Sequence, residues 1–454
     1  MSYAQSARRV ALDVIMAVRE SDAYANLLLP VQLERAKLSS ADAGLATELT
    51  YGTLRMQGYY DAVIAQAAGR DVSKIDPPVL DVLRLASHQL LSMRVPSHAA
   101  VDESVRLAKT IGSRSAVGFV NAVLRAITKH DAEVWRERVV GAAASGEQAL
   151  AVSYSHPLWV TRAFRQVLVA EGRESELEGL LAADNVPARV SVAALPGFSL
   201  IGELDVTPAE YSPLGGTLRE GDPAKNAAIA SGRARVQDEG SQLAALVLSR
   251  ARPIAAGESW LDMCAGPGGK AALLAAEALQ AGARLTANEV VPARAQLVRN
   301  ALAVFDAPPV VWEKDGVEIG NEYPEQFDRI LLDAPCTGLG ALRRRPEARW
   351  RKQPGDVAQL GALQTALLHS ALDALKPGGV LAYVTCSPHA AETKAIVGSV
   401  LRKSTTVSKM DTPSVMQSIV KHELDLPEGT HVQLWPHRHG TDAMFVQLLA
   451  KADS

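Results

Sequence analysis

From Val236 onward, short apolar runs alternate with helix-forming segments, a pattern that few folds accommodate. The runs are residues 259–262, 284–289, 329–333 and 380–384. Strands separated by helices form parallel βαβ units, so the pattern predicts an α/β domain over residues 236–454. Ligands bind beyond the carboxyl ends of such strands. The residues that follow each run are therefore expected to line one crevice.

All three cysteines of the chain follow these runs. Cys264 lies in Leu-Asp-Met-Cys-Ala-Gly-Pro-Gly-Gly-Lys, Cys336 in Asp-Ala-Pro-Cys-Thr-Gly and Cys386 in Tyr-Val-Thr-Cys-Ser-Pro. A single cysteine is most often a small buried hydrophobic residue. Thiols at three strand ends of one sheet instead indicate sulfur chemistry. An odd cysteine count also argues against a disulfide framework and is typical of a reducing compartment.

Length, charge and hydropathy narrow the remaining possibilities. At 454 residues the chain is expected to hold two or three domains. Its net charge of −3 excludes a uniformly basic nucleic-acid-binding chain, so contacts with nucleic acid must come from local patches. The sequence has no apolar run of about 18 residues and no apolar secretion signal at its N-terminus. We therefore expect a cytoplasmic protein with no membrane contact.

The first half of the chain has a different pattern. Within residues 1–135, apolar residues recur at helical spacing, as in 11–18, 79–86 and 117–124, and no strand signal is found. This pattern predicts a helical bundle. Residues 136–235 contain a further helical stretch and then short β-like runs separated by Pro and Gly, which predicts a small α/β linker domain.

The first apolar run leads into a glycine-rich turn, residues 262–270, that opens a helix. Glycines let a backbone approach a ligand closely, and a helix N-terminus offers free N–H groups. Glu289 ends the next run, where an acid can accept both ribose hydroxyls, and Asp315 follows a third run. The turn is not G-x-G-x-x-G, so a mononucleoside-like ligand such as S-adenosylmethionine is favoured over a dinucleotide. The plainer interpretation is a structural turn with surface acids.

Cys336 and Cys386 end strands that should lie close together in the sheet, and Asp333 stands just before the first of them. This set suits methylation of cytosine at C5, a poor nucleophile. A thiolate that adds to C6 converts the ring into an enamine that attacks a methyl donor. A carboxyl group at N3 would drain charge from the ring. A free thiol has a pKa of about 8.5, so a positive neighbour is expected. The plainer roles are buried thiols and a capping aspartate.

A basic segment follows the Cys336 turn. Between residues 343 and 352 lie five arginines and a lysine, opposed only by Glu347 and interleaved with Trp350. Arginine contacts phosphate, and an aromatic ring can stack on an unpaired base. The predicted RNA contacts are Arg343, Arg344, Arg345, Arg349 and Trp350. Most charge runs, however, are solvated loops.

Together these motifs resemble the Nol1/Nop2/Sun family of RNA cytosine-C5 methyltransferases. The resemblance rests on Asp262–Lys270, Asp333–Gly338, Arg344–Glu347, Lys376–Gly379, Thr385–Ser387 and the entry segment Val236–Gln242. Residues 96–104 and 118–125 are similar to the NusB-like RNA-binding domain fused to the enzyme in the Sun (Fmu, RsmB-type) branch, the bacterial 16S rRNA methyltransferases.

The resemblance implies a multidomain chain: an all-α NusB-like bundle, the small α/β linker domain and a Rossmann-like class I methyltransferase domain. The last strand, residues 444–448, would run opposite to its neighbour. Cys386 would be the nucleophile that adds to C6, and Cys336 would assist product release. Asp333 would sit between the cofactor and the target base. The implied cofactor contacts are Cys264, Ala265, Gly266, Pro267, Gly268, Gly269, Lys270, Glu289, Arg294, Asp315 and Asp333, with Cys264 contributing mainly backbone.

We therefore expect an enzyme that methylates C5 of a cytosine in 16S rRNA, as RNA or as a small-subunit assembly intermediate. S-adenosylmethionine is the expected cofactor, and no metal and no obligate protein partner are expected. A tRNA or 23S rRNA cytosine methyltransferase stays open, although the fused helical domain argues against it. A DNA cytosine methyltransferase would need only the Pro-Cys turn, so Cys386 argues against it. A non-catalytic antitermination or assembly factor would explain residues 1–135 but not the second half.

Overall fold

The computed structural model describes residues 6–21, 23–111, 114–219, 222–402 and 404–453. The chain groups into two compact units, which are considered separately. The first comprises residues 1–165, 175–186 and 342–351, and the second comprises residues 166–174, 187–341 and 352–454.

Among its described residues, the first unit is helical wherever it has regular structure. Its helices are α1 (Ala7–Glu20), α2 (Ala25–Ala36), α3 (Ser40–Arg55), α4 (Gln57–Ala68), α5 (Pro77–Leu91), α6 (Ser97–Ile111), α7 (Arg114–Ile127), α8 (Ala132–Gly141), α9 (Gly146–Ser153), the start of α10 (Leu158–Ala170), α11 (Leu177–Ala183) and α17 (Ala348–Arg351). Ser6 caps α1 by accepting from Arg9 N at 3.2 Å, and two prolines open α5. Helix α5 is buried along most of its length, so it forms the centre of the bundle.

A small antiparallel sheet lies in the second unit. Its strands are β1 (Ser191–Ala194), β2 (Val206–Pro208), β3 (Gly215–Leu218) and β4 (Ala234–Val236), in the order β2-β3-β1-β4, with the short helix α12 (Ala227–Ala230) before β4. Strands this short bury little surface alone. A compact apolar cluster that includes Val192, Leu204 and Val206 supports them.

The large sheet of the second unit has the order β10-β12-β9-β8-β5-β6-β7, with β11 beside β12. Its strands are β5 (Ser259–Asp262), β6 (Arg284–Asn288), β7 (Val310–Trp312), β8 (Phe327–Asp333), β9 (Leu375–Thr385), β10 (Val407–Lys409), β11 (Val432–Gln433) and β12 (Phe445–Lys451). Strands β5 to β9 pair in parallel, whereas β12 runs antiparallel to β9. The strand order reverses direction at β5, which places the ligand crevice at the ends of β5 and β8.

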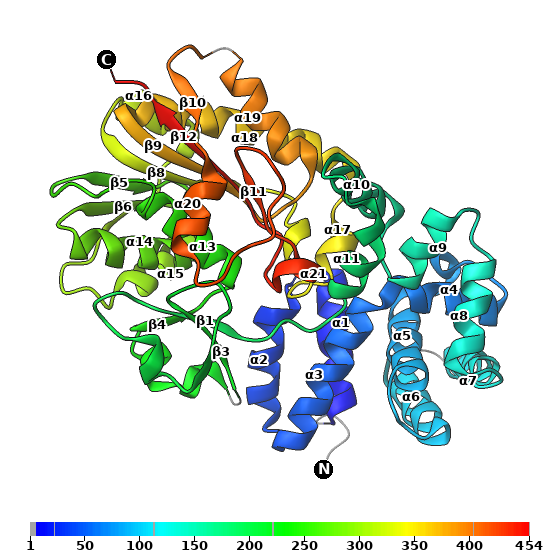
Figure 1. The fold of residues 1–454 in the computed structure, drawn as a ribbon. Coiled ribbons are helices and arrows are strands. Elements are labelled where there is room, and N and C mark those ends of the chain that lie inside the picture. Colours follow the sequence, from blue (N-terminus) through cyan, green and yellow to red (C-terminus); the bar gives the residue numbers. More distant parts are fainter. Residues whose placement is uncertain (1–5, 22, 112–113, 220–221, 403, 454) are drawn as a thin grey trace. The chain divides into compact units, whose positions relative to one another are not determined.

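Helices cover both faces of this sheet (Figure 1). They are α13 (Glu239–Ser249), α14 (Gly269–Gln280), α15 (Pro292–Leu302), α16 (Ile319–Glu322), α18 (Pro354–Ala374), α19 (Lys394–Leu401), α20 (Thr412–Ile419) and α21 (Pro436–His439). In β9, Val380, Ala382 and Val384 join the core beneath α13, α14 and α20. Leu381 and Tyr383 join the core beneath α16, α18 and α19. Because alternate strand residues face opposite sides, one apolar run supplies two cores.

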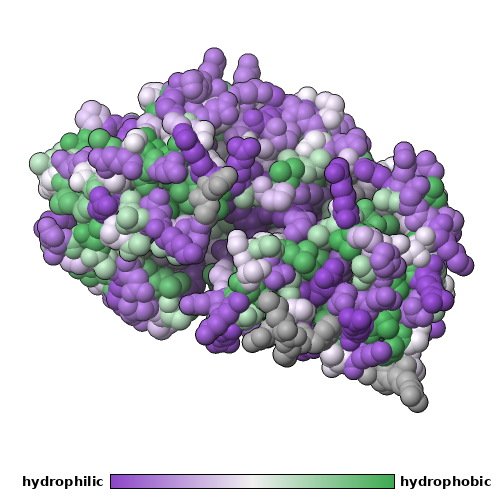
Figure 2. Space-filling view, turned by 90° about the horizontal axis from the view of Figure 1, so that it is seen from below, coloured by the Kyte–Doolittle hydropathy of each residue, from purple (hydrophilic) through white to green (hydrophobic). Residues whose placement is uncertain are grey.

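The surface mixes polar and apolar residues. Figure 2 shows hydrophilic side chains over much of one face, with hydrophobic ones scattered among them. Over the part of the chain that the structure describes, no helix has the length and apolarity needed to cross a membrane.

The structure confirms the helical N-terminal region and the Rossmann-like sheet with its reversed last strand. Strand β9 begins at Leu375, before the expected start at residue 380, because Lys376–Gly379 continue the strand through an irregularity in its pairing with β8. The expected domain boundaries at residues 135 and 235 stay predictions. Compactness divides residues 136–235 between the two units.

Candidate active site

The turn between β5 and α14 is shaped by glycine. Gly268 has a φ of +108°, a left-handed conformation that L side chains rarely adopt. A Cβ atom there would also lie only 2.5 Å from Ala301 Cβ and 3.1 Å from Val298 Cα in α15. The turn therefore packs its backbone against α15 and leads directly into the N-terminus of α14, whose N–H groups are available to a ligand.

Gly266 brings the same turn close to Glu289 and Arg294. A Cβ at Gly266 would collide with the Glu289 carboxylate and lie 3.0 Å from the Arg294 guanidinium. Arg294 Nη2 donates to Gly266 O at 2.8 Å and stands 3.4 Å from Glu289 Oε2. Glu289 is buried and also accepts from Val291 N at 3.0 Å. Three predicted cofactor contacts thus meet at one place.

Asn288, which the sequence did not single out, ties three strand ends together. Its Nδ2 donates to Met263 O and to Lys314 O, each at 3.1 Å, and its Oδ1 accepts from Lys314 N at 3.0 Å. Asp315 follows Lys314 and is exposed, and its carboxylate accepts from Val317 N at 3.0 Å. This bond turns the Asp315 carboxylate toward its own turn, so a link between Asp315 and the cofactor stays a prediction.

Asp262 is the second residue that sequence reasoning missed. It is buried, and neither carboxylate oxygen has a hydrogen-bond donor in good geometry among the described residues. Burial raises its pKa to about 8, and the charges of Asp333 and Glu289 act in the same direction, while Lys270 and the Cys264 backbone oppose them.

These features test whether the site fits S-adenosylmethionine. The Gly266 and Gly268 positions form a cradle that side chains would fill. Asp262 is a buried acceptor with no well-placed donor among the described residues, and Asp262, Glu289 and Asp333 provide an acidic surrounding for a sulfonium cation with an ammonium group. The residues present therefore fit this cofactor. Cys264 lies in the same surrounding, and its pKa is raised by burial and by these three acids, so its thiol stays neutral.

Lys270 and Asp333 form an ion pair beside the cysteines. Lys270 Nζ donates to Asp333 Oδ2 at 2.8 Å. Burial alone would lower the pKa of Lys270, but Asp333, the Cys386 thiol and Asp262 together raise it. Lys270 therefore stays a cation, and it is the positive neighbour that the sequence analysis expected for a reactive thiol.

The structure brings Cys336 and Cys386 together from the ends of β8 and β9. Their Sγ atoms lie 3.4 Å apart, and both residues are half-buried. Backbone bonds fix the two turns: Ala334 N donates to Val384 O at 2.8 Å, and Gly340 N donates to Cys386 O at 2.8 Å. The Cys386 thiol and burial, with a further contribution from Glu392, raise the pKa of Cys336 well above its ordinary value.

The basic segment does not form one exposed patch. Arg349 is fully buried in the first unit, where Nη1 donates to Ser155 O at 3.0 Å and to Asn185 Oδ1 at 2.9 Å, and Nη2 donates to Asp184 O at 3.3 Å. Burial lowers its pKa to about 10, so it stays charged at neutral pH. Its burial argues against the expected RNA contact, because Nη1 and Nη2 already bond within the protein.

The other members of the segment lie nearer the surface. Arg345 is exposed, with its guanidinium carbon 5.1 Å from the centre of the Tyr24 ring, and Arg343 and Arg344 are half-buried. The Trp350 ring packs on Gly58, where an added Cβ would collide with it. RNA contact by these residues stays a prediction.

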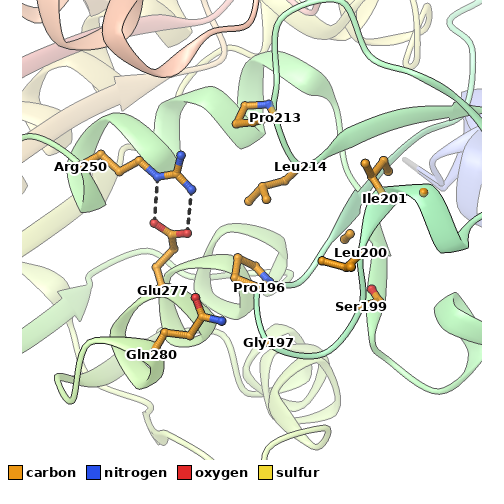
Figure 3. A pocket seen from close by; sticks show the side chains of 12 residues that line it. Pro196, Gly197, Ser199, Leu200, Ile201, Pro213, Leu214, Arg250, Glu277 and Gln280 are labelled. Carbon is orange, nitrogen blue, oxygen red and sulfur yellow. Dashed lines mark hydrogen bonds and ion pairs between the residues drawn. The ribbon is translucent and has the colours of Figure 1, made fainter.

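A separate cavity of about 340 Å³ lies in the second unit between the small sheet and helices α13 and α14 (Figure 3). Leu200, Ile201 and Leu214 give it an apolar wall. Arg250 and Glu277 pair across its polar side, with bonds of 3.0 and 3.1 Å. None of the residues predicted from the sequence lines this cavity.

Comparisons with known proteins place the chain in a family. Residues 252–450 match the 16S rRNA methyltransferase RsmB/F family, and residues 5–129 match the NusB family. A Mycobacterium tuberculosis protein named only as a methyltransferase is 47% identical over 98% of this chain and 96% of its own. Ribosomal RNA small subunit methyltransferase B of Pseudomonas putida is 30% identical over 93% of this chain and 96% of its own.

Solved structures share the fold. The protein PH0851 superposes with a TM-score of 0.81, covering 98% of both chains at 21% identity. NSun6 of Pyrococcus horikoshii, solved with SFG, has a TM-score of 0.53 and covers 64% of this chain and 98% of its own at 18% identity. The chain belongs to the RsmB/F family of 16S rRNA methyltransferases, which confirms the resemblance to the Sun branch. It is an S-adenosylmethionine-dependent rRNA methyltransferase.

Proposed function

We propose that the protein methylates C5 of a cytosine in 16S rRNA through a covalent bond between Cys386 and C6. The observation that carries this proposal is the approach of Cys336 Sγ and Cys386 Sγ to 3.4 Å beside the Lys270–Asp333 ion pair. A pyrimidine placed over the two thiols would have one sulfur for addition and one for release. Two strand-end cysteines at this distance are not needed for a plain binding domain.

The cofactor site would be built by the residues that the fold gathers at the β5 end. Glu289 would accept the ribose hydroxyls, Asp315 would serve the adenine side, and Asp262 would face the cationic part. Arg294 would act by holding Gly266 and Glu289 in place. The residues 264–270 would line the ligand with backbone groups. When bound, S-adenosylmethionine supplies an electrophilic methyl group.

The first chemical step would be addition of the Cys386 thiolate to C6, with Lys270 favouring the thiolate by its charge. The Lys270–Asp333 pair offers a donor and an acceptor to the base, and a donor at N3 drains negative charge as the C6–S bond forms. C5 then becomes nucleophilic enough to take the methyl group. Asp333 would thus act between cofactor and target, as the resemblance implies.

Release requires loss of the C5 proton and cleavage of the C6–S bond. Cys336 is the base that we assign to this step. The Cys386 thiol is the largest cause of the raised pKa of Cys336, and that cause disappears when Cys386 is bound to C6. The pKa of Cys336 therefore falls once Cys386 is bonded to C6, and only then can Cys336 ionise and accept the C5 proton. The electron pair then returns to Cys386 as thiolate.

Two observations support the proposed RNA target. The Pseudomonas putida relative is a ribosomal RNA small subunit methyltransferase, and the helical unit matches the NusB family. We propose 16S rRNA, as RNA or within an assembly intermediate, with Arg343, Arg344 and Arg345 contacting the backbone. A tRNA or 23S rRNA target, or a non-catalytic RNA-binding role, is an alternative outcome of the following experiment.

The proposal is tested by methyl transfer to purified 16S rRNA, with bisulfite mapping of the product. Cys386→Ala should abolish transfer while leaving cofactor binding nearly intact, because Cys386 contacts the base and not the cofactor cradle. Cys264→Ser is the matched control, and it should keep most of the activity because Cys264 contributes mainly backbone. Substantial turnover by Cys386→Ala, or 5-methylcytosine found only in tRNA or 23S rRNA, would contradict the proposal.

A further inference from the structure

One buried carboxylate joins the two cysteine turns. Glu392 stands in the short turn Ala390–Glu392 after β9, and its side chain is fully buried. Its Oε1 accepts from Thr337 N at 2.8 Å. Its Oε2 accepts from Thr337 Oγ1 at 2.5 Å and from Ser387 Oγ at 2.6 Å. Thr337 directly follows Cys336 and Ser387 directly follows Cys386, so the carboxylate accepts hydrogen bonds from both cysteine-bearing turns.

The surroundings of Glu392 hold it in one orientation. Gln364 Nε2 of α18 lies 3.3 Å from Oε1 and also donates to Pro335 O at 2.8 Å. Tyr383 OH donates to the Glu392 backbone carbonyl at 2.8 Å. Its side-chain hydrogen-bond donors are neutral. Charge-assisted hydrogen bonds of this length are stronger than neutral ones, so the Glu392 carboxylate fixes the positions of the two turns.

We propose that Glu392 is a positioning residue that sets the separation of Cys336 and Cys386 and thereby governs release of the methylated base. This inference rests on the proposed covalent mechanism. Without the carboxylate, the residues beside the two cysteines would still meet through the 3.1 Å contact of Thr337 Oγ1 with Ser387 Oγ, which is neutral and weaker. A shift of a few tenths of an ångström in either turn would move the Cys336 sulfur, which takes the C5 proton, away from its place beside the cytosine.

The charge of Glu392 adds a second effect on the same step. It raises the pKa of Cys336, after the larger contributions of Cys386 and burial. Tyr383 also interacts with Cys336 and Glu392, and His389 lies on the turn of Glu392 with a pKa that burial lowers. Once Cys386 is bound to C6, Glu392 is the acidic neighbour that still opposes ionisation of Cys336. Removing its charge should let Cys336 ionise at lower pH, so a slower decay of the adduct in Glu392→Gln must come from the lost hydrogen bonds to the two turns.

Glu392→Gln in the full-length protein tests the inference, because it keeps the shape and removes the charge. We expect the Cys386–RNA adduct to decay at least about tenfold more slowly, while the KM values for RNA and cofactor stay within about twofold. The pH at which adduct decay becomes maximal should move to lower pH. Glu171→Gln is the matched control, since Glu171 is another buried carboxylate of this unit, accepting from Trp435 Nε1 at 3.1 Å.

A readout without RNA measures the geometry directly. A mild oxidant such as diamide takes two hydrogens from two thiols and closes a disulfide, at a rate that reports how often the sulfur atoms meet. Mass spectrometry of the Cys336–Cys386 peptide pair should show slower closure in Glu392→Gln than in the wild type or Glu171→Gln. If Glu392→Gln fails to bind cofactor, Thr337→Val and Ser387→Ala, each removing one side-chain bond to Glu392, should still slow closure.

The outcomes separate this inference from the proposed function. Wild-type rates of adduct decay and disulfide closure in Glu392→Gln would overturn the positioning role. Equal defects in Glu171→Gln and Glu392→Gln would reduce Glu392 to a structural carboxylate. If Cys336→Ala forms no covalent adduct with the RNA, the covalent mechanism itself is wrong. If Cys336→Ala traps an adduct and Glu392→Gln does not slow its decay, only the role of Glu392 is wrong.

Discussion

Replacement of Asp262 by Asn should remove a pH dependence of cofactor affinity. Asp262 is buried without a donor of good geometry among the described residues, and burial raises its pKa to about 8. A carboxylate attracts the cationic cofactor and a neutral carboxyl group does not, so binding should be coupled to release of a proton from Asp262. Affinity should therefore increase as the pH rises toward 8.

The magnitude follows from the fraction of ionised Asp262. With a pKa of about 8, roughly 1% of this carboxyl group is ionised at pH 6 and half at pH 8. When only the ionised form binds, the apparent dissociation constant scales inversely with that fraction, which gives a limit of roughly 50-fold between the two pH values. Partial binding to the neutral form would reduce this ratio.

Isothermal titration calorimetry with S-adenosylmethionine between pH 6 and pH 8 measures this effect. The α-amino group of the cofactor titrates near pH 7.7–8.0 on its own, so Asp262→Asn supplies the baseline. The wild type should gain affinity with pH relative to Asp262→Asn and should release an additional proton, seen by comparing buffers with different ionisation enthalpies. Parallel curves for the two proteins would refute the reasoning, as would a wild type that binds relatively better at pH 6.

The same carboxyl group affects stability with a defined sign. Its folded-state pKa of about 8 exceeds the ordinary value of 3.8, so between these pH values the folded protein holds a proton that the unfolded chain has lost. Its contribution to the free energy of unfolding therefore falls as pH rises through this window, by about 1.4 kcal/mol per unit at most. Asp262→Asn should become more stable relative to the wild type as pH rises, as urea unfolding would show.

Three further experiments test the basic segment and the cysteine turns. Replacing Arg343, Arg344 and Arg345 by Ala should reduce the slope of log affinity for RNA against log salt concentration by about 0.7–0.9 for each phosphate that is no longer neutralised. An unchanged slope would mean that the segment is a solvated loop without RNA contacts. Arg349→Met should lower the free energy of unfolding in urea by about 3–5 kcal/mol, because Ser155 O, Asn185 Oδ1 and Asp184 O lose a charged donor. Arg345→Met should change it by under about 1 kcal/mol, and equal effects of the two substitutions would refute the burial argument. Gly340→Ala should abolish methyl transfer but not cofactor binding, since the added Cβ would collide with Ala443 O and lie 2.8 Å from Cys386 O, which would displace the Cys336 turn from the Cys386 turn. Full activity would contradict this.

Local patterns predicted the framework of the site well. The alternation of apolar runs predicted the parallel strands, and the glycines and acids at their ends marked the cradle of Gly266, Gly268 and Glu289. Cys336 and Cys386 were expected to meet because strand ends of a parallel sheet share one edge. These inferences succeed because each depends on a short stretch of chain and on a general rule of sheet topology.

The missed residues act through contacts between distant segments. Asn288 joins three strand ends, and Glu392 bridges turns 50 residues apart in the sequence. Glu392 can be found near Thr385–Ser387 in the sequence, but only the fold shows which groups donate to its carboxylate. Burial weakens the case for Arg349 as an RNA contact for the same reason, because charge in a run does not reveal burial. Pro346 and Ala348, which stand close to Arg349 in the sequence, are buried too. These apolar residues between the arginines were the one sign in the sequence that part of the segment is buried.

The central claim is that two sulfur atoms bracket one pyrimidine. The measurement that tests it most directly is mass spectrometry of Cys336→Ala after incubation with 16S rRNA and S-adenosylmethionine. The account predicts a denaturation-resistant adduct in which a methylated cytidine is bonded to Cys386, since addition and transfer proceed without the base that completes release. Absence of any adduct, or attachment of the nucleotide to a residue other than Cys386, would contradict the account.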